Sequence, residues 1–222
     1  SDFGFLGFYI VPPAHRGKGY GMQIWTAGLD HLAGRTVGLD GVVDQQSNYR
    51  KSGFEFSGRN VRFSGRATTT GVSGGASIHA ITSDMLIDIA TYDSVFFPAD
   101  RAAFIADWAH PRTLAARTGL VATNGRQITG FCVMRKCREG YKIGPLFADD
   151  PVIAGDLFAA TCARMEPGSA LAIDVPEDNA PAVALARRAG LTPTFETARM
   201  YKGPAPALPL DRIFGITTFE LG

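Results

Sequence analysis

The sequence has few cysteines, no long apolar run and no excess of charge of either sign. Its 222 residues include three cysteines, Cys132, Cys137 and Cys162, which form no C-x-x-C pair. This spacing indicates neither a disulfide framework nor a zinc knuckle. The 22 Lys and Arg nearly balance the 21 Asp and Glu, so no overall field attracts nucleic acid or an anionic membrane. Any charged ligand must therefore be bound by a local group of residues.

Targeting and metal signals are equally scarce. No stretch approaches the roughly 20 apolar residues of a membrane-spanning helix, and the first residues lack a basic region followed by an apolar core. The four histidines show no metal-like spacing. We therefore expect a cytoplasmic protein with no metal, no nucleic-acid partner and no membrane partner. A hydrophobic content of 45% is nevertheless enough to build real cores.

A segment rich in Gly, Ser and Thr, "GRATTTGVSGGAS" at 65–77, divides the chain. This composition is typical of a flexible linker. The sequence therefore predicts a first domain over 1–64, a linker over 65–77 and a second domain over 78–222.

The first section predicts strand, glycine loop, helix, strand, helix and closing strands. The continuous apolar run 3–11 is typical of a central strand buried on both faces. After the loop, Trp25, Leu29 and Leu32 share one face of a helix that we expect to end at Gly34. "TVGLDGVV" predicts a strand, "QQSNYRKSG" a short helix, and "FEFSGRNVRF" one or two strands.

The second section begins with two predicted helices over 82–93 and 98–110. Two β-rich runs then flank Asn124-Gly125, a strong hairpin signal. Strand, helix, strand, helix and strand follow in "YKIGPLFA", "PVIAGDLFAATCARM", "ALAIDVP", "NAPAVALARRAG" and "FETARMY". The segment 208–222 has an ordered composition but no assignable element.

The glycine loop "HRGKGYG" at 15–21 lies between a predicted strand and a predicted helix. The loop does not match a Walker A motif, because Lys18 is followed by Gly19 rather than by Ser or Thr. Its Gly-x-Gly-x-Gly spacing does not match the dinucleotide-binding fingerprint either. The remaining pattern, R-x-x-G-x-G, lets successive backbone N–H groups surround an anion at a helix N-terminus. A pyrophosphate fits such a nest, although a solvated turn at Arg16 and Lys18 is the simpler alternative.

The stretch "VPPAHRGKGYG" resembles the acyl-CoA pyrophosphate loop of the GNAT superfamily of N-acetyltransferases, and "YRKSGF" resembles that family's Y-x-K-x-G-F segment. The resemblance implies that acetyl-CoA is the co-substrate. It places the pyrophosphate on the backbone of Gly17, Gly19, Tyr20 and Gly21, with charge from Arg16 and Lys18. It also implies that backbone groups near Ile10 and Val11 pair with the pantetheine amides.

Tyr49 matches the position of the tyrosine that protonates the departing thiolate in many family members. A hydroxyl near the sulfur acts as general acid when an amine expels the thiolate. Packing of Tyr49 between helix and sheet is the structural alternative. The family's Asn-x-x-Ala opening is absent before Tyr49, where "VVDQQSNY" offers other polar residues.

The second section resembles a GNAT domain in degenerate form. It keeps an Asn179-x-x-Ala182 opening, but Asp149 and Asp150 follow the strand where a glycine loop would lie. These carboxylates would repel a pyrophosphate, so we expect no acetyl-CoA there. We interpret Asp149 and Asp150 as a turn and a helix cap in preference to a functional carboxylate pair.

The resemblance extends to bacterial proteins with tandem GNAT domains, one working and one degenerate. It implies an α/β (α+β) fold of two GNAT-like domains, each a mixed central sheet flanked by helices. A whole GNAT domain has three strands and two helices before the glycine-loop strand. We therefore expect the N-terminal half of the first domain to be absent from this chain.

The function that the resemblance implies is transfer of an acetyl group to a primary amine by direct attack in a ternary complex. The acceptor is a small molecule or a peptide, and whether the chain pairs with itself stays open. The alternative is a non-catalytic CoA-binding or regulatory protein. A binder of other nucleotide phosphates is a more distant third.

Overall fold

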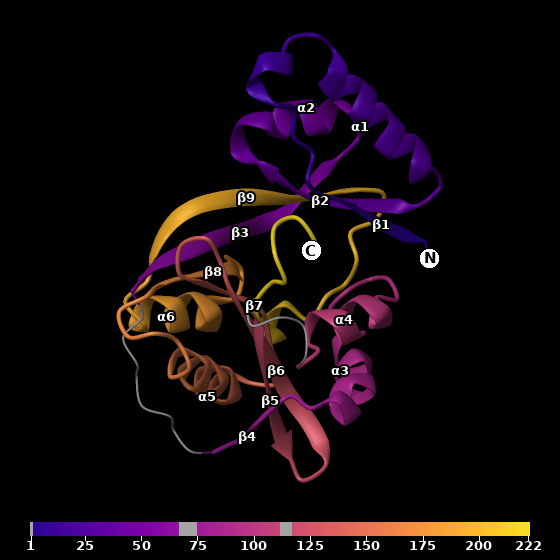
Figure 1. Ribbon diagram of the computed structural model, residues 1–222. Helices are drawn as coiled ribbons and strands as arrows, with labels where there is room; N and C mark the ends of the chain where they lie inside the picture. The colour runs from indigo at the N-terminus through magenta and orange to yellow at the C-terminus, as the bar shows by residue number, and fades with distance from the viewer. Residues whose placement is uncertain (1, 67–74, 112–116) are drawn as a thin grey trace.

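The computed structural model describes residues 2–66, 75–111 and 117–222. In this part of the chain, ten strands form one mixed sheet in the order β1-β2-β9-β3-β8-β7-β6-β5-β4, with β10 paired to β7 (Figure 1). The strands are β1 (Phe3–Leu6), β2 (Thr36–Val42), β3 (Glu55–Arg66), β4 (Ser77–Ala80), β5 (Arg117–Asn124), β6 (Gln127–Lys136), β7 (Tyr141–Ala148), β8 (Ala170–Pro176), β9 (Thr192–Lys202) and β10 (Ile213–Gly215). The helices are α1 (Tyr20–His31), α2 (Gln46–Lys51), α3 (Leu86–Asp93), α4 (Ala102–Trp108), α5 (Pro151–Cys162) and α6 (Ala180–Arg188). The predicted class, a mixed central sheet flanked by helices, is confirmed.

An exchange of strands joins the two sections of the chain. β3, from the first section, lies between β8 and β9, and β9, from the second section, lies between β2 and β3. Figure 1 shows β3 and β9 running together between the two groups of helices. The predicted linker falls largely on 67–74, outside the described residues. The division into domains at 65–77 stays a prediction.

The second section covers its strands with helices on both faces. Because side chains alternate across a strand, Leu120 and Cys132 pack in the cluster that includes residues of α5 and α6. Val121 and Val133 point the other way, into the cluster that includes residues of α3 and α4. The hairpin at Asn124-Gly125 is confirmed, with β5 and β6 paired on either side of it.

The first section has its own core on one face of its strands. Trp25 and Leu32 are buried and Leu29 packs beside them, which confirms the predicted apolar face of α1. They lie against Leu39 of β2 and Met200 of β9, so the exchanged strand completes this core. Residues that alternate with Met200 on β9 therefore face away from α1 and α2.

The prediction of a central strand over 3–11 is wrong. β1 ends at Leu6, lies at one end of the described sheet and is only partly buried. The chain turns at Phe8, whose φ of 55° lies in the left-handed region that non-glycine residues seldom adopt. An apolar run cannot by itself distinguish a buried strand from a short strand followed by an apolar loop.

Candidate functional site

The glycine loop forms an open turn ahead of α1. Gly17 and Gly19 have φ of 75° and 80°, and no atom lies within 4 Å of where a side chain would begin at either position. Both conformations favour glycine, because a Cβ strains the left-handed region. The loop is braced by Arg16, whose Nε donates a hydrogen bond to the Val11 carbonyl at 3.0 Å.

The N-terminus of α1 faces this turn without a side-chain cap. Gly19 is the N-cap residue, and the first turn carries no acidic side chain. The first backbone N–H groups of a helix have no partner within it, and the helix dipole makes this end favourable for an anion. The loop therefore offers N–H groups together with the exposed cations of Arg16 and Lys18.

A cleft of about 350 Å³ lies beside this loop, where β1 and β2 stop pairing. β1 and β2 pair in parallel from Phe3 with Thr36 to Leu6 with Leu39, and then the two strands separate. The turn at Phe8 takes the chain away from β2, so residues 7–10 and 39–42 form opposite walls of the cleft.

Tyr49 lies in this cleft, on the side covered by α1 and α2. Its ring centroid lies 5.5 Å from that of Trp25, and its edge lies against Gly41 of β2, where a Cβ would overlap the ring. Burial, with a smaller contribution from Tyr9, raises the pKa of the Tyr49 hydroxyl. The hydroxyl thus keeps its proton at neutral pH, as a proton donor must.

The predicted cofactor residues fall into two groups. Five of them line a hollow that adjoins the cleft through Tyr9 and Gln45, and these five are Ile10, Val11, Arg16, Gly17 and Gly21. Ile10 and Val11 lie beyond β1, so their backbone groups are outside its ladder. Gly19 caps α1, whereas Lys18 and Tyr20 are exposed, and the Tyr20 ring lies 6.1 Å from that of His15.

The far side of the cleft holds groups that the sequence reasoning missed. The Asp40 carboxylate, fully buried in β2, accepts two hydrogen bonds from Arg199 of β9 at 2.9 and 2.7 Å. It also accepts one from Asn60 of β3 at 2.8 Å. A charged residue in the middle of the strand "TVGLDGVV" was the available signal, because such a residue is seldom buried without a partner.

The segment 217–222, which we call the strap, completes that side. Phe219 and Glu220 line the cleft, and the Glu220 carbonyl lies so close to Gly7 that a side chain at Gly7 would clash with it. The Arg62 guanidinium lies over the Phe219 ring, and its central carbon is 4.6 Å from the ring centroid. The strap thus brings residues from the second section to the cleft of the first, as the end of the chain in Figure 1 shows.

The second section has a matching gap between strands, and the chain itself fills it. β7 and β8 pair in parallel only from Tyr141 to Ile143 and then separate. β10 occupies the space, pairing with β7, while the Ile216 N–H donates to the Asp174 carbonyl of β8. No comparable strand lies between β1 and β2 in the described part of the chain.

The N-terminus of α5, the helix that follows this gap, is already capped by a side chain of the protein. Asp150 is the N-cap of α5, and its carboxylate accepts hydrogen bonds from the N–H groups of Val152 and Ile153 at 2.8 and 2.9 Å. Asp149 pairs with Arg212 and accepts a hydrogen bond from the Tyr92 hydroxyl. The preferred interpretation of Asp150 as a helix cap is therefore confirmed.

The described residues were also compared with the requirements of a metal site and of a membrane-spanning helix. Among the described residues, no group of three His, Cys, Asp or Glu side chains could hold a metal ion. None of the described helices is long and apolar enough to cross a membrane.

Comparisons with known proteins agree with this geometry. The family model described as "Acetyltransferase (GNAT) domain" matches residues 89–215. A holothin acyltransferase from Pseudoalteromonas sp. is 31% identical over 222 residues, which are 100% of this chain and 74% of that protein.

Solved structures share the fold at lower identity. A protein from Pyrococcus horikoshii, provisionally assigned as an acetyltransferase, has a TM-score of 0.81 at 22% identity. The match covers 100% of this chain and 73% of that protein. A tandem GNAT protein from the clavulanic acid biosynthesis pathway has a TM-score of 0.58 at 12% identity, over 93% and 77% of the two chains. From the family match and the acyltransferase relative together, the chain belongs to the GNAT acetyltransferase family.

Proposed function

We propose that the protein transfers an acetyl group from acetyl-CoA to a primary amine in the cleft between β1 and β2. The observation that carries this proposal is the continuity of that cleft with the glycine loop, with Tyr49 lining the cleft. The matching gap in the second section is filled by β10, which supports one reaction site in this chain. The relative from Pseudoalteromonas is named as an acyltransferase, which supports the same class of reaction.

The glycine loop binds the pyrophosphate in this proposal. Backbone N–H groups from Gly17 to Gly21 surround the phosphate oxygens, and the α1 dipole and Arg16 add positive potential. Backbone groups near Ile10 and Val11 pair with the pantetheine amides, which brings the thioester to the cleft beside Tyr49.

The reaction is a direct displacement. The neutral amine nitrogen forms a bond to the thioester carbonyl carbon, and the carbon–sulfur bond breaks. The Tyr49 hydroxyl gives its proton to the departing thiolate, and the proton lost by the amine leaves to solvent or to the tyrosinate. The products are an N-acetylated amine and CoA. In this proposal the amine approaches from the side of the sheet opposite α1 and α2, which pack on the other side.

A non-catalytic CoA-binding role is the second candidate. It is favoured by the packing of Tyr49 against Trp25 and Gly41, because a purely structural tyrosine makes the same contacts.

Tyr49→Phe in the full-length protein separates the two. The variant keeps the ring packing and removes the proton donor, so we expect kcat to fall roughly 10²-fold or more with the affinity for acetyl-CoA unchanged. Thiol release with a panel of amines measures the rate, and calorimetry measures the affinity. Acetyl-CoA binding without amine-dependent thiol release from the wild type would support the non-catalytic role instead.

A further inference from the structure

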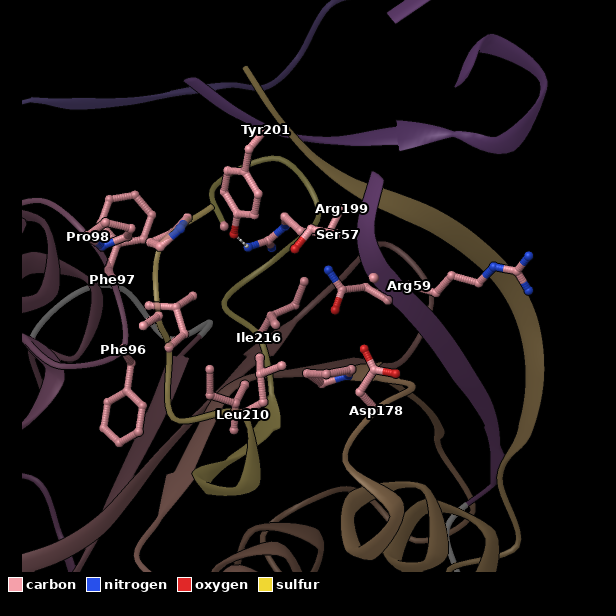
Figure 2. Close-up of a pocket in the computed structure, with 18 of the residues that line it drawn as sticks. Ser57, Arg59, Phe96, Phe97, Pro98, Asp178, Arg199, Tyr201, Leu210 and Ile216 are labelled. Atoms are coloured by element: carbon pink, nitrogen blue, oxygen red, sulfur yellow. Dashed lines mark hydrogen bonds between the residues drawn. The ribbon is translucent and has the colours of Figure 1, made fainter. Parts of the chain in front are cut away.

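A second cavity, of about 290 Å³, lies between the two sections of the chain. Its walls come from β3, β9, the loop before α4 and the segment that leads to β10. Figure 2 shows Phe96, Phe97 and Pro98 on one side, Tyr201 and Arg199 above, and Leu210 and Ile216 below. This combination of aromatic and aliphatic walls with few polar groups is typical of a site for a small organic molecule.

The charges around the cavity are unequal. The Arg199 guanidinium is already paired with Asp40 and donates a hydrogen bond to the Tyr201 hydroxyl. Figure 2 shows the Arg59 side chain extending away from the cavity, whereas Asp178 lies at its edge. Within the described residues, the Asp178 carboxylate has no hydrogen bond or ion pair. Asp178 thus places one carboxylate without an ion-pair partner at this exposed edge, where it disfavours a further carboxylate beside it.

The cavity and the cleft are neighbours on one side of the sheet. Arg199 lines the cavity, and its partner Asp40 lines the cleft. The strap lies between them, with Glu220 on the cleft and Gly222 on the cavity. Both spaces are lined by side chains on the face of β9 opposite α1 and α2, with Arg199 and Tyr201 in the cavity and Thr197 in the cleft.

We propose that this cavity binds the body of the acyl acceptor, and that the acceptor is a small aromatic amine without an acidic group. The proposal rests on the proposed acetyl transfer and adds the class of its substrate. The ring is held among Phe96, Phe97 and Tyr201, and the amino group lies on the side of the cavity that adjoins the strap and the cleft. Asp178 disfavours acceptors that carry a carboxylate.

Binding without acetyl-CoA tests the cavity independently of catalysis. The probes are 2-phenylethylamine, phenylalanine, which adds a carboxylate to the same framework, and putrescine, which has amines but no ring. We expect calorimetry of the full-length protein to give the order 2-phenylethylamine, phenylalanine, putrescine from tightest to weakest. The proposal is overturned if none binds at millimolar concentration, or if putrescine binds most tightly.

Substitutions that fill the cavity locate the binding. Leu208→Trp and Ser57→Trp each add a large ring to the cavity wall, and we expect each to weaken 2-phenylethylamine binding roughly tenfold. Ser57 lies on the surface, so its variant remains informative if Leu208→Trp fails to fold. The matched control is Ile87→Trp on α3, where the native side chain is 79% exposed. Equal weakening by the control, or no change in either cavity variant, contradicts the proposal.

Asp178→Asn tests the selection against acids. The change removes one charge with little change of shape, and we expect it to narrow the preference for 2-phenylethylamine over phenylalanine about fivefold. An unchanged preference contradicts the role of Asp178. If the amines bind as expected but acetyl-CoA does not bind, the proposed reaction fails while the cavity remains a binding site.

Discussion

The ring of Tyr49 on α2 lies directly against Gly41 of β2, so close that a Cβ at Gly41 would overlap its Cε2 and Cδ2 atoms. The absence of a side chain at position 41 is what allows the tyrosine to lie in the cleft between β1 and β2. A methyl group there must push the ring away from its place.

Gly41→Ala should therefore impair the reaction even though the hydroxyl remains. We expect kcat to fall roughly 10-fold to 100-fold, approaching the loss in Tyr49→Phe, because a small misplacement of a reacting group is costly. Steady-state thiol release measures it. Gly155→Ala on α5, where a Cβ meets no atom within 4 Å, is the control and should keep full activity. Full activity of Gly41→Ala would mean that the position of Tyr49 does not matter for the chemistry.

The dependence of kcat on pH should show that Tyr49 stays protonated. Its pKa is raised above the ordinary 10.0 by burial, so the donating form persists through neutral and moderately alkaline pH. We expect no fall in kcat below pH 10 that depends on Tyr49. A fall between pH 8 and pH 9 that disappears in Tyr49→Phe would show that the tyrosine loses its proton much earlier than its environment implies.

The thiols should differ in reactivity. Burial raises the pKa of Cys132 and of Cys162 to about 12, whereas Cys137 is partly exposed. Because the thiolate is the reactive form, we expect Cys137 alone to react with a thiol reagent in the native protein and all three to react after unfolding. Cys137→Ser should abolish the native reaction. Rapid native modification of Cys132 or Cys162 would contradict the packing of α5 against β6.

The cap of α5 should contribute measurably to stability. Asp150→Ala removes two hydrogen bonds to backbone N–H groups, and we expect the free energy of unfolding to fall by about 1 kcal/mol. Urea denaturation measures the loss, with the exposed Glu139→Ala as the control. The variant should gain no second site for acetyl-CoA, because β10 still fills the gap between β7 and β8. A second equivalent of bound acetyl-CoA would overturn this explanation.

The elements follow from local patterns in the sequence, and their arrangement does not. The face of Trp25, Leu29 and Leu32 predicts α1, and Asn124-Gly125 predicts the β5–β6 hairpin, because both depend on neighbours in sequence. The exchange of β3 and β9 depends on pairings between residues more than 100 positions apart. No local pattern encodes such pairings.

The site divides in the same way. The glycine loop could be predicted from the sequence, because the positive φ at Gly17 and Gly19 favours glycine at both positions. The far wall of the cleft was missed, because Asp40, Arg199 and Phe219 come together only through the exchanged strand and the strap. The edge position of β1 was also missed, since the apolar run 3–11 carries no information on what lies beside it.

The most direct measurement is a calorimetric titration of acetyl-CoA into the full-length protein, beside a variant that carries Arg16→Ala and Gly19→Asp. We expect the wild type to bind close to one equivalent per chain. We expect no binding by the variant, because an aspartate in the loop repels the pyrophosphate and strains a turn that favours glycine. No binding by the wild type, or undiminished binding by the variant, would contradict the assignment of the glycine loop as the acetyl-CoA site.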